Sequence, residues 1–166
     1  MKINLSARLC ALSVCAALAG CSNKQIDGVK NMTFDADFTL TIGQAFDHRK
    51  VCDSVKWDTL KDDRDRLLVE YRCYFKGIDT LVANTAKSSN PLQSIDEVFQ
   101  WSTNDGGAPV LMYVGSEMNY EDGTIKDHAY GNAAAAEKLI ADNKAADFSQ
   151  YSSLFATQSL VNFIQN

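Results

Sequence analysis

The stretch VKWDTLKDDRDRLLVEYRCYF, residues 55–75, decides the fold that we predict for this chain. Apolar and polar residues alternate on both sides of a wholly charged segment at 61–65. Such alternation is typical of half-buried strands, and a charged break between two such runs indicates a turn. One face of each strand is apolar and the other largely polar, as in an antiparallel sheet with one solvated side. The pattern therefore predicts a hairpin over residues 53–76.

The position of the turn sets which residues face each other across this hairpin. If the chain folds about Asp63, Val55 lies near Tyr71. Trp57 then lies near Val69 in the same register. We expect these four side chains on the apolar face.

A second hairpin is predicted over residues 95–120. Its strands, 95–103 and 110–120, flank the sequence NDGG at 104–107, which is a strong turn signal. The second strand has the longest apolar run in the region, which favours a central strand covered on both faces. The sequence EDGT at 121–124 ends it in another turn.

Weaker patterns fill the rest of the first two thirds of the chain. Residues 34–42 alternate between apolar and polar, which predicts a strand. A short helical turn over 44–50 can follow, with Thr41 as its cap. Residues 77–94 are polar and rich in Ser, Asn and Ala, so we expect a long surface loop.

The last third of the chain has helical character. Asn132 can cap the alanine-rich segment 133–144, and Asp147 with Gln150 three positions later forms a capping-box arrangement for a further helix. Strands first and helices last argue for an α+β fold. We expect an antiparallel sheet of about four to five strands, with the C-terminal helices packed on one face.

The N-terminus carries an export pattern. A positive head and a short apolar run at 9–18 are typical of a secretory signal peptide, and the run is too short for a membrane-spanning helix. The four residues Leu18-Ala19-Gly20-Cys21 resemble the lipobox of bacterial lipoproteins. The resemblance covers the signal segment alone. It implies cleavage after residue 20 and a membrane anchor of acyl chains on Cys21.

The same resemblance organises the chain into three parts. We expect a cleaved signal peptide at 1–20, the lipidated cysteine and a tether at 21–32, and a single globular domain at 33–166. Ser22 stands where lipoproteins retained in the inner membrane commonly carry aspartate, so the protein resembles the outer-membrane class. The expected location is the periplasmic side of that membrane.

Cysteine usage agrees with export. Cys10 and Cys15 fall in the removed segment and Cys21 carries lipid, which leaves Cys52 and Cys73. An even remainder in an oxidising compartment predicts one disulfide. The first hairpin brings both cysteines to its open end, where their Cα atoms can approach within the roughly 7 Å that a bridge needs.

The expected mature chain is acidic. Removal of Lys2 and Arg8 leaves 14 basic and 21 acidic residues, a formal charge of −7. No basic cluster is present, which argues against nucleic acid and against an electrostatic membrane surface as partners.

The sequence contains few signatures of catalysis. His48 and His128 are the only histidines, and Asp127 adjoins His128 in sequence without normally facing it. No G-x-S-x-G or other nucleophile motif is present, and zinc would need clustered Cys and His. We therefore assign no catalytic residue, no metal ligand and no cofactor.

Two groups of acidic residues have competing interpretations. In the first hairpin, the interleaved arginines Arg64 and Arg66 favour a solvated turn over a calcium site; the carboxylates concerned are Asp62, Asp63 and Asp65. Paired carboxylates for glycoside hydrolysis depend on a separation that only the fold sets. The candidates on or beside the second hairpin are Glu97, Glu117, Glu121 and Asp122.

Binding features are more suggestive. Arg72 and Tyr74 share the polar face of their strand, and Tyr113 and Tyr120 lie on the long apolar strand. Tyrosine and arginine are enriched in interface cores, although large aromatics also bury in domain cores. The loop at 77–94 and the turn tip at 105–107 are alternative contact surfaces.

We arrive at two hypotheses of different class. The first is a protein-binding module of inhibitor, immunity or envelope-accessory type, which predicts an aromatic or acidic patch on the sheet or long loop. The second is a small-ligand binder or hydrolytic enzyme acting on envelope material, which predicts a pocket near His128 or residues 117–122. In outline, a short helix before an antiparallel meander is similar to the envelope-assembly lipoproteins related to β-lactamase-inhibitor folds, but no motif accompanies that outline.

Overall fold

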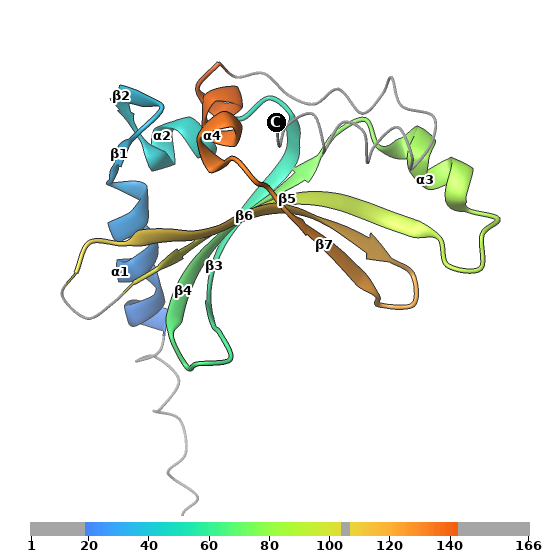
Figure 1. Ribbon diagram of the computed structural model, residues 1–166, viewed down its shortest axis with the longest axis horizontal. Coiled ribbons are helices and arrows are strands. Elements are labelled where there is room, and N and C mark those ends of the chain that lie inside the picture. The colour runs from blue at the N-terminus through green and yellow to red at the C-terminus, as the bar shows by residue number, and fades with distance from the viewer. Residues whose placement is uncertain (1–18, 104–106, 143–166) are drawn as a thin grey trace, which may run out of the picture.

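The computed structural model describes residues 19–103 and 107–142 (Figure 1). Its elements, in chain order, are α1 (Ala19–Lys30), β1 (Thr33–Phe34), β2 (Asp37–Thr41), α2 (Ile42–Phe46), β3 (Cys52–Lys61), β4 (Leu67–Phe75), α3 (Asp79–Thr85), β5 (Leu92–Ser102), β6 (Val110–Tyr120), β7 (Ile125–Ala129) and α4 (Ala133–Ala141). The strands in these ranges form a five-stranded antiparallel sheet, β3-β4-β5-β6-β7, and a separate β1-β2 pair. The predicted α+β class is confirmed.

The sheet is a meander in which each strand pairs with the next along the chain. The middle strand is β5, most of which is buried, and not β6 as its apolar run suggested. Pairing with β7 leaves β6 one strand from the edge. The sequence of β7, IKDHA, gave no strand signal because four of its five residues are exposed.

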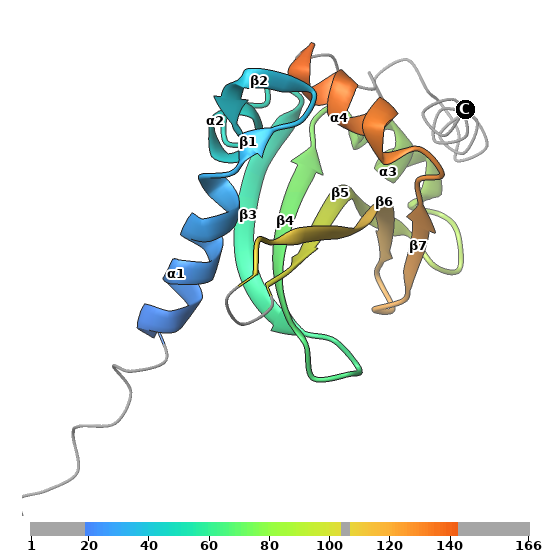
Figure 2. The same cartoon turned by 60° about the vertical axis from the view of Figure 1, so that its left-hand side comes forward.

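Helices pack on one face of this sheet. Buried residues of the helices and of alternate strand positions form one cluster, in which α1 contributes Val29, α2 contributes Phe46, α3 contributes Leu81 and α4 contributes Ile140. Figure 2 shows α2 and α4 side by side above the curved sheet. Phe46 is central: ring centroids 4.8 to 6.2 Å from its own belong to Phe34, Trp57, Tyr71, Phe99 and Trp101.

The first hairpin is confirmed as β3 and β4, but its register differs by two residues from the predicted one. Trp57 faces Tyr71, and Val55 faces Cys73. The loop spans residues 62–66, and its centre lies at residue 64 because Asp65 adopts a left-handed φ of 60°. A shift of two keeps every side chain on its predicted face, since strand side chains alternate with period two.

Three segments of the N-terminal half differ from expectation. Residues 34–42 form two short strands joined by a turn and not one strand. The predicted cap Thr41 is confirmed and forms a capping box with Gln44, but α2 covers Ile42–Phe46 and not residues 44–50. The expected long loop contains α3, because Leu81 is fully buried in the core.

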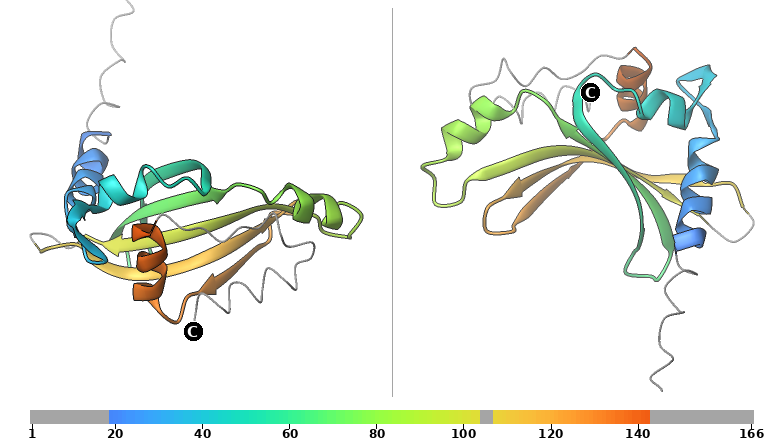
Figure 3. Two further views of the ribbon diagram at one scale, coloured as in Figure 1. Left: turned by 90° about the horizontal axis from the view of Figure 1, so that it is seen from above. Right: turned by 180° about the vertical axis from the view of Figure 1, so that it is seen from behind.

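The segment expected as a tether is also ordered. Residues 19–30 are helical in α1, and the last turn of α1 packs against the sheet through Val29. Figure 3 shows α1 alongside the β3-β4 hairpin. The predicted helix start at Asn132 is confirmed in α4, whereas the capping-box helix after residue 147 lies outside the described residues.

Candidate functional site

The face of the sheet opposite the core cluster carries the candidate site. Strand register places Glu70, Arg72 and Tyr74 of β4 on this face, with Asp96 of β5 and Glu117 of β6. We call this surface the polar face. None of these five residues belongs to the core cluster, whose strand residues occupy the alternate positions.

Arg72 is the centre of a charged cluster on the polar face. Its guanidinium donates to Glu70 Oε1 at 3.1 Å, to Asp96 Oδ2 at 3.1 Å and to Glu117 Oε2 at 2.5 Å. The side chains are largely shielded, with 18% of Arg72 and 3% of Asp96 exposed. Three carboxylates therefore surround one cation, and the cluster has two negative charges in excess when all are ionised.

Amide side chains complete the cluster. Gln100 donates to Glu70 Oε2 at 2.8 Å, and Asn119 donates to Asp96 Oδ2 at 2.8 Å. The other oxygen of the Asp96 carboxylate, Oδ1, is buried and has no hydrogen-bond partner. A buried carboxylate oxygen without a donor costs free energy, so the cluster can still accept a hydrogen bond.

The electrostatics follow from this geometry. Burial alone would lower the pKa of Arg72, but the hydrogen bond to Glu117 and the charges of Glu70 and Glu117 hold it above its usual value. Burial raises the pKa of the Asp96 carboxyl, and the hydrogen bond from Arg72 opposes that shift. Asp96 and Glu117 face each other directly across β5 and β6, so Arg72 also screens their mutual repulsion.

The predicted tyrosines have three different environments. Tyr74 is half-buried on the polar face and lines a pocket of about 480 Å³ beside Gly77 and Ile78. Tyr113 lies over Gly115 with a buried hydroxyl that has no partner, and burial raises its pKa to about 12. Tyr120 is buried in the core cluster, so the structure does not bring it together with Arg72.

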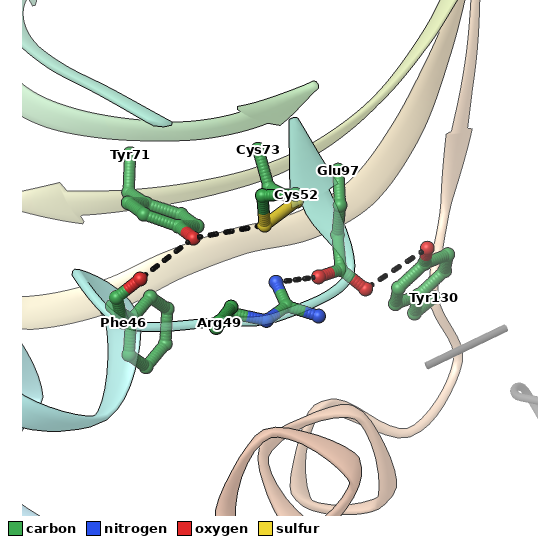
Figure 4. The surroundings of a disulfide bond; sticks show 7 residues. All are labelled: Phe46, Arg49, Cys52, Tyr71, Cys73, Glu97 and Tyr130. Atoms are coloured by element: carbon green, nitrogen blue, oxygen red, sulfur yellow. Dashed lines mark hydrogen bonds and ion pairs between the residues drawn. A yellow bond between two sulfur atoms is a disulfide. The ribbon is translucent and has the colours of Figure 1, made fainter. Parts of the chain in front are cut away.

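A second charged group lies inside the domain, next to the disulfide (Figure 4). Arg49 and Glu97 form an ion pair whose side chains are 3% and 4% exposed. Tyr130 donates a hydrogen bond of 3.3 Å to the other Glu97 oxygen. Burial alone would lower the pKa of Arg49, but the charge of Glu97, the Tyr71 hydroxyl and the hydrogen bonds to both residues together raise it.

The disulfide predicted between Cys52 and Cys73 is confirmed, with a Cα–Cα distance of 5.3 Å. Tyr71 lies beside it, with its hydroxyl 3.6 Å from the Cys52 sulfur and donating to the Phe46 carbonyl at 3.0 Å. Glu97 faces Cys73 directly across β4 and β5. The bridge therefore joins the start of β3 to the centre of the buried polar group.

The residues considered for catalysis do not converge. Glu117 faces the polar side. The neighbouring pair of β6 and β7, Ser116 opposite His128, faces the core side. His48, Glu121 and Asp122 are exposed. Within the described ranges, no group of three or more His, Cys, Asp or Glu side chains could hold a metal ion.

The carboxylate of Asp62 stabilises the hairpin loop by accepting hydrogen bonds within it. It accepts hydrogen bonds from the backbone of Arg64 and Arg66 at 2.9 Å and from the Arg66 side chain at 2.6 Å. These bonds lower the pKa of Asp62. The turn interpretation of this acidic segment therefore has a structural basis in these three bonds.

Sequence reasoning missed Arg49 and the role of Glu97. Arg49 lies in the short connection between α2 and β3, where no periodic pattern indicates burial. Glu97 had a detectable signal: it interrupts the alternate apolar residues Ile95, Phe99 and Trp101 on the core side of β5. A carboxylate in such a row is expected to have a buried partner.

Comparison with known proteins leaves this chain without a match: no protein-family model, no curated protein and no solved structure is similar to it. Across residues 19–103 and 107–142, no helix has the length and apolar character needed to cross a bilayer.

Proposed function

We propose that this protein is a lipid-anchored lipoprotein on the periplasmic side of a membrane, in the outer-membrane class, that works by binding another protein. The polar face is the binding surface. The observation that carries the proposal is the cluster around Arg72, in which three carboxylates share one guanidinium on the sheet face that none of the described helices covers.

The charge balance of the cluster selects the partner's chemistry. Its excess negative charge is compensated by a lysine or arginine side chain placed on the polar face. Asp127 is exposed on the same face of β7 and adds to the negative potential. The preferred partner is therefore a basic surface, and complementary charge also raises the association rate.

The alternative, an enzyme or small-ligand binder acting on envelope material, needs Glu117 or His128 in a pocket with convergent polar groups. These two residues lie on opposite faces of the sheet. The pockets of about 480 and 440 Å³ contain neither of them. The geometry favours binding over hydrolysis.

A pull-down from membranes tests the binding proposal. The bait is the full-length protein, and the matched variants are Glu117→Gln with Asp127→Asn on the polar face, and Asp63→Asn in the exposed hairpin loop. Gln can still accept the hydrogen bond from Arg72, so the fold is expected to persist. We expect the same partner with the wild type and with Asp63→Asn, and its loss at raised salt or in the polar-face variant.

Two results would contradict the proposal. One is equal recovery of the partner by the polar-face variant and the wild type. The other is repeated failure to recover any protein from membranes of the native host.

The anchor has its own test. A Cys21→Ser variant is expected to move from the membrane fraction to the soluble fraction, because no acyl chains are attached. Mass spectrometry of the N-terminal peptide should show a lipidated Cys21 in the wild type. An unmodified residue 21 or a retained signal segment would refute the lipoprotein assignment while leaving the polar face untouched.

A further inference from the structure

A pocket of about 440 Å³ lies between the β1-β2 pair, α4 and the start of β6, away from the polar face. Its inner wall is formed by Phe34, Ile42 and Trp101, which are almost fully buried. The first turn of α4 forms another wall through Ala133. The volume is within the range of pockets that hold small ligands or single anchor side chains.

Two carboxylates stand over this apolar interior. Asp35 projects from the β1-β2 turn and Glu137 from α4, and both line the pocket. Neither is joined to a cation among the described residues. Burial raises the pKa of Glu137, and the charge of Asp35 raises it further. Both carboxylates would therefore gain from a cation placed between them.

The chemistry of the pocket matches one kind of side chain. Lysine and arginine have an apolar stem that can lie along Phe34 and Trp101, with a charged head that can reach Asp35 and Glu137. At the rim, Val110 is 54% exposed. A free amine would leave this apolar side chain uncovered, whereas a polypeptide can cover it with a neighbouring residue.

We infer that this pocket binds a lysine or arginine side chain of a partner polypeptide that carries an apolar residue beside it. The inference rests on the proposed function in one respect, namely that the partner is a protein. It is independent of the cluster around Arg72, because no residue of that cluster lines the pocket.

The test measures binding of defined peptides to the folded protein by fluorescence anisotropy. The probes are a labelled, end-capped hexapeptide AALKLA and its counterpart AALELA. We expect AALKLA to bind at least about tenfold more tightly, because two carboxylates attract one peptide and repel the other. Glu137→Gln and Asp35→Asn should each raise the Kd for AALKLA by about threefold, since both groups are partly solvated.

A second variant separates the pocket from general electrostatics. Ala133→Leu keeps a good helix former in α4 but places three extra carbons at the pocket wall, so it should abolish binding without changing the charge. The matched control, Glu121→Gln, removes an exposed carboxylate outside the pocket and should leave the Kd unchanged. Unfolding curves confirm that each variant is folded.

Several outcomes would overturn the inference. They are equal binding of the two peptides, an unchanged Kd in both Glu137→Gln and Ala133→Leu, or no binding of AALKLA at millimolar concentration. Butylamine with a Kd equal to that of AALKLA would assign the pocket to a free amine and would also overturn it. Capture of a membrane partner through the polar face, without peptide binding in the pocket, would contradict this inference but not the proposed function.

Discussion

Replacement of Arg49 by Met should be among the most damaging single changes in the domain. The variant removes a buried cation, and among the described residues the hydroxyl of Tyr130 is then the hydrogen-bond donor that Glu97 keeps. Breaking a buried ion pair from one side costs about 3–5 kcal/mol, because the remaining charge is uncompensated. That loss is a large part of the roughly 5–15 kcal/mol by which a typical domain is stable.

The paired change gives a sharper expectation. In Arg49→Met with Glu97→Met, no charge is left in the core, and burial of two apolar side chains replaces the ion pair. The Tyr130 hydroxyl loses its acceptor, which costs about 1–3 kcal/mol. We therefore expect the double variant to lose about that much free energy of unfolding relative to the wild type and to be more stable than Arg49→Met alone. The two losses are therefore expected to be strongly non-additive.

Equilibrium unfolding in urea, without reductant, measures these differences. Trp101 lies in the core cluster and Trp57 packs at its margin, so their fluorescence reports loss of packing. The matched control is Lys56→Met, alone and together with Asp58→Met. It removes an exposed ion pair within β3 and should change the stability far less than Arg49→Met does. A loss below about 1 kcal/mol in Arg49→Met, or losses that simply add, would refute the reasoning.

Three other predictions concern the disulfide, a close backbone approach and a titrating carboxyl. Replacing Cys52 and Cys73 by Ala should lower the free energy of unfolding by about 3 kcal/mol in urea titrations, and an undiminished value would contradict the loop-closure argument. Gly115→Ala should cost about 1–3 kcal/mol, because the new β-carbon would lie 2.6 Å from a backbone carbonyl oxygen of β7, and an unchanged melting temperature would count against this. Burial raises the pKa of Glu137, so its contribution to stability is present below the usual carboxyl pKa and is lost as pH rises through the raised value. Glu137→Gln should therefore stabilise the protein relative to wild type at pH 7 but not at pH 3, as thermal melts at the two values can show.

Alternation was sufficient to predict β3 and β4 but not their exact pairing. The face on which each side chain lies depends only on whether its position along the strand is odd or even, and the alternation of apolar and polar residues shows this. The register depends on whether the five-residue loop is centred on residue 63 or on residue 64, and the left-handed conformation of Asp65 belongs to the loop centred on residue 64. Asp tolerates this conformation better than most residues, but several aspartates compete for the position in the sequence.

Elements with little buried surface escaped prediction. The strand β7 is at the edge of the sheet, so its residues do not alternate between core and solvent. The helix α3 has one fully buried side chain, Leu81, within a polar sequence. In both segments tertiary pairing, and not local pattern, determines the structure.

The candidate site was predictable only in part. The polar face of β4 follows from alternation, which is why Arg72 and Tyr74 were identified. The convergence of Asp96 and Glu117 on Arg72 depends on two registers that join strands distant in sequence. Tyr120 was placed with them because it follows an apolar run, yet it lies on the core side, at the same alternate positions of β6 as Val114 and Met118.

The ordered helix α1 has a geometric consequence for an anchored protein. About 14 Å of helix, at 1.5 Å per residue, separates Cys21 from Lys30, where the chain joins the core. Figures 1 and 3 place the N-terminal end of α1 and the β3-β4 loop at the same end of the domain, and β1 with α4 at the other end. Under the proposed lipidation, α1 would act as a rigid spacer that fixes the orientation of the domain relative to the membrane. The charged hairpin loop would then point toward the headgroups, and the pocket beside α4 would open toward the aqueous space.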